Sequence, residues 1–214
     1  MARILPATRS MNHSGALAGK RLSSLKGRVG EALVENILHR AGYKIARAGR
    51  ESQVQQMLKT GISEFLPDFL VWKPADAAIK GGPLHKVLSI EVKYRHNIPE
   101  YLARFGAAFL SDVAEQWPDL HVVLVTDDPE SGRSCFQALN LRGYEPSSPL
   151  ATRDLYEVPE LGIFRSTVEE YEQLAKQIFS LLAAQLPDRW RVRKPLGKVT
   201  EYDGDWQDAG AGSQ

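Results

Sequence analysis

The sequence predicts one α/β domain in which helices flank a mixed central sheet. Residues 25–42 carry apolar side chains at helical spacing, and residues 65–72 and 86–95 are strand-like runs joined by a segment rich in Gly and Pro. Residues 121–126 are an unbroken apolar run, which is typical of a buried central strand. Because the helix-spaced segment 99–117 precedes this run, the strands on either side of it are expected to be parallel neighbours.

The first predicted helix has a continuous apolar stripe and a plausible end. The stripe consists of Leu25, Val29, Leu33, Ile37 and Ala41. Gly42 is expected to end the helix, and residues 43–48 are expected to form a short strand. Residues 1–24 mix Arg, Ser, Asn, Gly and Pro without periodicity, which predicts a flexible basic arm.

A β-hairpin is the natural interpretation of the next segment. The runs 65–72 and 86–95 are rich in β-branched and aromatic residues. The interval 73–85 contains two prolines and two glycines, which favours a turn or loop. Before the hairpin, the polar segment 49–64 is expected to be a solvated connection, and its glutamines are candidates for contacts to base edges.

Side-chain alternation brings three charged groups to this hairpin. Asp68 lies on the face of Leu70, and Ser89, Glu91 and Lys93 project together from the second strand. A charged residue within such an apolar run is costly if it is buried without a partner, so these groups either face solvent or bind a ligand. Two carboxylates and a lysine suit a hard divalent cation with a water or phosphate beside it. The alternative is a turn-capping aspartate and a solvated ion pair.

The C-terminal half predicts fewer regular elements. Residues 131–159 are broken by glycine and proline, which predicts a loop-rich insertion with one further strand, for example at 155–158. Ser166 or Thr167 is expected to cap a last helix. Its apolar stripe consists of Val168, Tyr171, Leu174, Ala175, Ile178, Leu181, Leu182 and Leu186. This helix either covers a face of the sheet or forms a dimer contact.

Composition excludes several classes of protein. The single cysteine, Cys135, rules out an intramolecular disulfide and a cysteine-rich zinc site, which agrees with a reducing cytoplasm. The five histidines show no metal-ligand spacing. No segment has the features of a signal peptide or the ~20 apolar residues of a membrane span. A cytoplasmic protein without a membrane association is therefore expected.

Charge is unevenly distributed although the formal net charge is only +1. Residues 1–50 hold ten Lys and Arg against two acids, and residues 187–199 form a second basic segment that interleaves a tryptophan with cations. Such segments suit phosphates and stacked bases, although a solubilising tail and a packed tryptophan are the alternatives. Residues 201–214 are acidic and Gly-rich, which predicts a disordered tail.

Two short motifs give the hairpin a family resemblance. Pro67-Asp68 and Glu91-Val92-Lys93 resemble the two conserved elements of the PD-(D/E)XK phosphodiesterase superfamily, the restriction-endonuclease-like nucleases that include Holliday junction resolvases. The family also commonly carries a glutamate on the preceding helix. Both Glu31 and Glu35 can reach such a position, and the resemblance favours Glu31. The resemblance covers about residues 27 to 126.

The resemblance implies an αβββαβ core of restriction-endonuclease type and a metal-dependent reaction. It implies that Asp68, Glu91 and the backbone carbonyl of Val92 bind Mg²⁺ or Mn²⁺. It further implies that Lys93 orients the attacking water and that Glu31 completes the metal shell. The family's Gln-x-x-x-Tyr exonuclease motif is missing after Lys93, which makes an end-processing exonuclease less favoured.

The leading hypothesis is therefore a metal-dependent endonuclease that acts on DNA, including branched DNA. The alternatives are an inactive nucleic-acid-binding or scaffold protein, an RNA-cleaving relative, and a nuclease subunit of a transposition or phage-defence complex with protein partners. The expected organisation is an arm (1–24), a nuclease-like domain (25–200, with a C-terminal extension at 131–200) and a tail (201–214). A homodimer is expected, because such enzymes commonly cut two strands with two sites. The residues expected to contact nucleic acid are Arg28, Arg95, Trp190, Arg191, Arg193 and Lys194.

Overall fold

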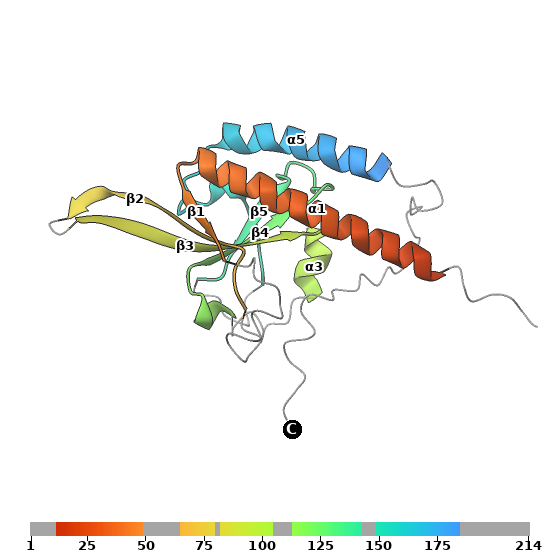
Figure 1. The fold of residues 1–214 in the computed structure, drawn as a ribbon, viewed down its shortest axis with the longest axis horizontal. Coiled ribbons are helices and arrows are strands. Elements are labelled where there is room, and N and C mark those ends of the chain that lie inside the picture. The colour runs from red at the N-terminus through yellow and green to blue at the C-terminus, as the bar shows by residue number, and fades with distance from the viewer. Residues whose placement is uncertain (1–11, 49–64, 80–81, 105–112, 143–148, 185–214) are drawn as a thin grey trace, which may run out of the picture.

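A six-stranded mixed sheet lies between helices on both of its faces in the computed structural model (Figure 1). The structure describes residues 12–48, 65–79, 82–104, 113–142 and 149–184. The helices are α1 (Asn12–Arg40), α3 (Ile98–Arg104), the 3-10 helix η1 (Leu155–Glu157) and α5 (Arg165–Ala184). The strands are β1 (Lys44–Arg47), β2 (Phe69–Ile79), β3 (Gly82–Tyr94), β4 (Leu120–Val125), β5 (Phe136–Asn140) and β6 (Arg153–Asp154).

The spatial order of the strands is β1-β2-β3-β4-β5-β6, the same as their order in the chain. Strands β3 and β4 are parallel, and the other four neighbouring pairs are antiparallel. The parallel pair is the one for which the sequence predicted a helical crossover, and α3 lies in that connection. Helix, strand, hairpin, helix and strand thus follow one another from α1 to β4 as the apolar periodicity indicated.

Helix α1 starts earlier than predicted. It begins at Asn12, so residues 12–24 are helical where the sequence predicted part of a flexible arm. Ala, Leu, Lys and Arg, all good helix formers, dominate residues 16–22. A helix that has already formed extends easily, because each added residue loses its backbone freedom in return for one hydrogen bond. The end of the helix was predicted correctly, because Gly42 follows it with a φ of 86°, a conformation that glycine adopts without strain.

The β2–β3 hairpin is confirmed, but its strands are longer than predicted. The interval 73–85 was expected to be a loop, whereas it continues both strands, and the chain reverses between Ile79 and Gly82. The register shifts between Pro74 and Ala78, and such an irregularity is where a sheet tolerates a proline. The outer part of the hairpin projects beyond the remaining strands (Figure 1).

The two faces of the sheet have separate apolar cores. On one face, α1 and α5 pack over β2, β3 and β4 through Ile37, Phe179, Phe69, Ile90 and Val123, among others. On the other face, α3 packs through Ile98 and Tyr101 on Leu120, Val122 and Leu124. All six residues of β4 are buried, because this central strand contributes to both cores.

The region after β4 is more regular than predicted. The single further strand expected between 131 and 159 is two strands, and the run 155–157 is η1 instead of a strand. Strand β5 lacks alternation because it is almost fully buried, with Gln137 held inside by hydrogen bonds. Alternation of apolar and polar residues predicts a strand with one exposed face. Because β5 is buried on both faces, its sequence lacks this pattern and the strand was not predicted.

Helix α5 covers the sheet beside α1, one of the two roles predicted for it. It begins at Arg165, so Ser166 and Thr167 lie inside the helix instead of capping it. The predicted stripe was too wide: Leu174 and Leu181 are exposed, and Phe179, which the stripe omitted, is buried. Within the described ranges, no helix has both the length and the apolar character needed to cross a membrane.

Candidate active site

The hairpin places Asp68 opposite Glu91. Phe69 pairs with Ile90, so one further step of the same register aligns these two carboxylates. The backbone N–H of Asp68 donates to Oε2 of Glu91 at 3.1 Å, and the backbone N–H of Val92 donates to Oδ2 of Asp68 at 2.8 Å. Each carboxylate therefore accepts a hydrogen bond from a backbone N–H of the opposite strand segment, which holds the two carboxylates next to each other.

Lys93 joins this pair from the same strand. It lies two residues after Glu91, so both side chains project from the same face of β3. The Nζ of Lys93 is 2.8 Å from Oε1 of Glu91, and the Lys93 side chain retains 18% exposure while that of Glu91 retains 5%. The predicted grouping of Asp68, Glu91 and Lys93 is thus present in the structure.

Burial gives Glu91 an unusual protonation equilibrium. Its neighbour on β4 is Val122, a member of the apolar core beneath α3. Burial raises the pKa of Glu91 from 4.5 to about 7; Lys93 opposes that rise and the Asp68 carboxylate adds to it. The pKa of Asp68 is also raised, again chiefly by burial, although the Val92 N–H and Lys93 hold it down.

Glu31 approaches the same charges from helix α1. Burial raises its pKa, the Asp68 carboxylate raises it further, and Lys93 lowers it. Close packing of the helix brings the residue there: a Cβ at the preceding Gly30 would stand 3.4 Å from the Val125 side chain. At this residue, α1 therefore lies within van der Waals range of the end of β4.

Glu35, the other candidate on α1, has a different partner. Both of its carboxylate oxygens accept hydrogen bonds from the Arg47 guanidinium of β1, so it forms a bidentate ion pair. Arg47 also lies over the Phe69 ring, at 5.6 Å from its centroid, and its charge lowers the pKa of both Glu31 and Asp68. Arg47 was not among the residues predicted for the site, although its place at the end of the strand before the motif was a usable signal.

The donor set suits a hard divalent cation. The Lys93 ammonium acts on all three carboxylates and Arg47 acts more weakly on two of them, yet all three have raised pKa values, so added positive charge would be favourable there. Among the residues that the structure describes, no group of three or more His, Cys, Asp or Glu side chains is arranged to hold a metal ion. The donors that remain for a cation are the pair Asp68 and Glu91 with the Val92 carbonyl, and a direct bond from Glu31 stays a prediction.

The residues predicted to contact nucleic acid fall into two groups. Arg28 is exposed on α1 and lies close enough to lower the pKa of Glu31. Arg95 is half-buried: its guanidinium lies 4.2 Å from the Tyr101 ring centroid and donates to the Tyr94 carbonyl at 2.8 Å. The four others, Trp190, Arg191, Arg193 and Lys194, lie outside the described residues.

A second charged cluster, also missed from the sequence, lies at the ends of β3 and β4. Asp127 accepts hydrogen bonds from Lys26 Nζ at 2.5 Å and from the Tyr94 hydroxyl at 2.7 Å. Its Oδ1 is 2.9 Å from Nδ1 of His96. These donors hold the pKa of Asp127 far below its ordinary value, against the effect of burial. The position of Asp127 directly after a buried strand was the available signal, because strand ends gather polar side chains.

Comparisons of this chain with models of protein families, with curated proteins and with solved structures find no match.

Proposed function

We propose that this protein is a divalent-metal-dependent endonuclease that hydrolyses phosphodiester bonds of DNA. The observation that carries the proposal is the hairpin pairing of Asp68 with Glu91, with Lys93 beside them on the same face. The order of elements from α1 to β4 supports it, because the same order is expected for the αβββαβ core of the restriction-endonuclease-like nucleases that the motifs resemble.

The cation would be held by Asp68, Glu91 and the carbonyl of Val92. When bound, Mg²⁺ or Mn²⁺ would polarise the phosphate and lower the pKa of a bound water. Lys93 donates hydrogen bonds only, so its role is to orient that water and to stabilise the negative charge that grows on the phosphate oxygens. Glu91, with a pKa of about 7, exchanges a proton near neutral pH, so cation binding there competes with protonation.

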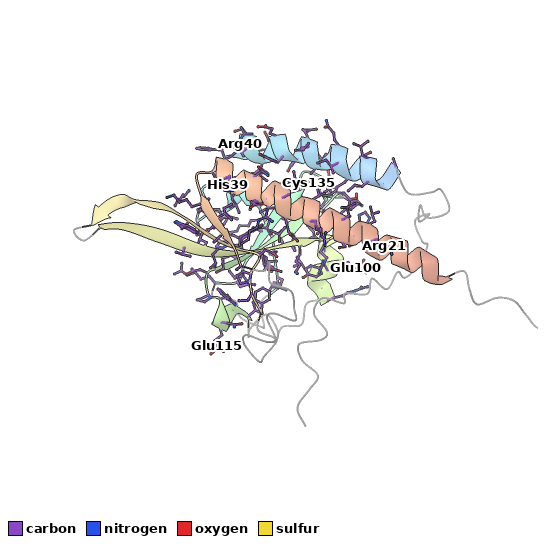
Figure 2. The ribbon with its side chains drawn as sticks, in the orientation of Figure 1. Arg21, His39, Arg40, Glu100, Glu115 and Cys135 are labelled. Atoms are coloured by element: carbon purple, nitrogen blue, oxygen red, sulfur yellow. The ribbon has the colours of Figure 1, made fainter. Side chains whose placement is uncertain are left out.

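Helix α1 offers an approach for the DNA backbone. Residues 12–30 contain four cations and no acid, and Glu31 is the first carboxylate of the helix. Arg21 and Arg28 are exposed, and Figure 2 shows Arg21 on the N-terminal part of the helix. Positive charge next to the carboxylates lets a phosphate approach a site that would otherwise repel it.

A cleavage assay tests the proposed function. We expect the protein to cut plasmid or branched DNA with Mg²⁺ or Mn²⁺ and to be inactive in EDTA. Asp68→Asn keeps an oxygen that can accept the Val92 N–H, so it preserves the hairpin while removing a charged ligand, and cleavage is expected to fall to background.

Asp119→Asn is the matched control, because Asp119 is half-exposed and lies at the opposite end of β4 from Val125. Its activity is expected to equal that of the wild type. Activity in EDTA, or undiminished cutting by Asp68→Asn, would overturn the proposed mechanism. DNA binding without cutting in any metal would favour the nucleic-acid-binding alternative instead.

A further inference from the structure

Lys26 is a buried cation on a part of α1 that has few other anchors. Only 7% of the residue is exposed, and it is the one buried residue among the described side chains of α1 before Gly30. Its Nζ lies 5.1 Å from the Tyr94 ring centroid and 5.7 Å from that of Phe179, so its stem and charge both rest on aromatic rings. A lysine is rarely buried to this extent unless it is paired.

The partners of Lys26 come from the two parallel strands. Asp127 lies two residues after the end of β4, and Tyr94 is the last residue of β3. The ammonium donates to Oδ2 of Asp127 at 2.5 Å and to the Tyr94 hydroxyl at 3.1 Å, and that hydroxyl in turn donates to Oδ1 of Asp127. Three elements distant in sequence are thus joined by one closed network of charge-assisted hydrogen bonds.

This network fixes the part of α1 that carries Glu31. Glu31 lies between Lys26 and Leu33, where the fully buried apolar contacts of the helix begin. On its N-terminal side, the helix is held to the sheet by Lys26, by the partly buried Val29 and by the contact of Gly30 with Val125. Without the ion pair, the described side chains of α1 that precede Leu33 would keep few contacts that fix the distance of the helix from β4.

We propose that Lys26 is a positioning residue: by clamping α1 to Asp127 and Tyr94, it holds Glu31 beside Asp68 and Lys93. The role of Glu31 in this statement rests on the proposed function, whereas the clamp itself is a property of the fold. Lys26 acts on Glu31 through the helix, because the charges that act on Glu31 are those of Asp68, Lys93, Arg47 and Arg28.

Backbone hydrogen exchange tests the clamp without metal or DNA. Lys26→Met keeps the length of the side chain and its contact with the rings but removes the ammonium. Loss of a hydrogen-bonded charge is expected to raise the exchange rates of amides 27–32 by at least about tenfold. Tyr94→Phe, which removes only the hydroxyl from the network, is expected to raise them less, and it serves if Lys26→Met does not fold.

Arg133→Met is the matched control, because Arg133 pairs with the buried Asp154 of the edge strand β6. It removes a cation from a similar ion pair and is expected to leave amides 27–32 unchanged. Unaltered exchange of these amides in both Lys26→Met and Tyr94→Phe, or the same increase in Arg133→Met, would refute the clamp whether or not the protein cuts DNA.

A double-mutant cycle tests whether the clamp acts through Glu31. In the active protein, Lys26→Met is expected to lower kcat by about tenfold or more, as loss of a supporting partner does, with KM for DNA unchanged. Combined with Glu31→Gln, it is expected to add no further loss, and Lys26→Arg is expected to restore part of the rate. Additive losses in the cycle would show that Lys26 is merely structural and would overturn the positioning role.

Discussion

Glu91 and Asp127 are carboxylates near the ends of neighbouring strands, yet burial and partners give them opposite properties. Asp127 accepts hydrogen bonds from Lys26 and Tyr94 and contacts His96, and its pKa lies far below the ordinary value. Glu91 is more deeply buried, shares its surroundings with Asp68, and has a pKa of about 7. The difference lies in the partners: Asp127 alone has three hydrogen-bonding partners, whereas Glu91 and Asp68 share the ammonium of Lys93.

The comparison separates a group that stabilises the fold from one that is available for binding. A satisfied carboxylate such as Asp127 gains nothing from a further cation, whereas the cluster around Glu91 would be relieved by one. Unfavourable groups are commonly retained where function needs them, at a cost in stability. Four experiments can test whether the two clusters differ in this way.

The largest effect is expected from the removal of the Asp127 carboxylate, with removal of the Glu91 carboxylate as the comparison. Asp127→Asn leaves the buried Lys26 without its counter-charge and is expected to lower the free energy of unfolding by about 3 kcal/mol at pH 7. Glu91→Gln removes a carboxylate whose ionisation is disfavoured, so its stability at pH 7 is expected to equal or exceed that of the wild type. Urea unfolding measures both. An equal loss in the two variants would remove the distinction.

The pH dependence of stability is expected to have opposite signs at the two sites. Because the pKa of Glu91 is raised in the folded state from 4.5 to about 7, folding takes up a proton between these values, and stability falls by about 3 kcal/mol as pH rises through this window. The pKa of Asp127 is lowered, so its contribution is present above pH 3.8 and is lost as pH falls further.

Unfolding of the wild type and of Glu91→Gln at several pH values from 2 to 8 checks both signs. The variant is expected to show a much smaller decline between pH 4.5 and 7, because only Glu31 and Asp68, whose pKa values are also raised, still contribute to it, and it retains the loss of stability below pH 3.8. A decline of the same size in Glu91→Gln would mean that another group is responsible. Asp127→Asn provides the complementary control, because it keeps the decline and loses part of the acid-induced fall.

Mn²⁺ is expected to stabilise the protein through only one of the two clusters. At one hundred times its dissociation constant, a cation that binds only the folded state adds about 2.7 kcal/mol. We expect this gain at pH 8 in the wild type, less at pH 6 because protons compete for Glu91, and none in Asp68→Asn. Calorimetric melting with and without Mn²⁺ measures the gain. Full stabilisation of Asp68→Asn would place the cation elsewhere.

The smallest effect is expected at His96. Its hydrogen bond with Asp127 raises the pKa of the imidazole, so its contribution is present below pH 6.5 and disappears as pH rises through the raised value. The side chain is more than half exposed, so His96→Gln is expected to cost less than about 1 kcal/mol at pH 6 and nothing at pH 9. A larger loss that persists at pH 9 would assign His96 a packing role.

Much of the candidate site could be predicted because it is local. Alternation within the hairpin was sufficient to group Glu91 with Lys93, and the apolar runs on either side indicated that both would be partly buried. The exact opposition of Asp68 and Glu91 could not be predicted, because the register depends on how far the strands continue through residues 73–85.

The second cluster could not be predicted, since it depends on tertiary contacts. Lys26 and Asp127 are 101 residues apart in the chain, and nothing in their local sequence relates them. From the sequence, Gly30 is only a residue of low helix propensity, and its position beside the Val125 side chain is known only from the structure. Such contacts follow from the packing of a helix on a sheet, which periodicity alone does not specify.

The agreement between strand order in space and in the chain bears on how the protein folds. Every strand pairs with its neighbour in sequence, and the β2–β3 hairpin has the shortest connection in the sheet, whereas the β1–β2 and β3–β4 pairs must each close a longer one. During synthesis, Glu31 to Lys93 are all available before β4, β5 and β6 have emerged. We therefore expect the hairpin that carries the candidate catalytic groups to be an early folding unit. The ion pair of Asp127 with Lys26, which fixes α1 to the sheet, is expected to form later.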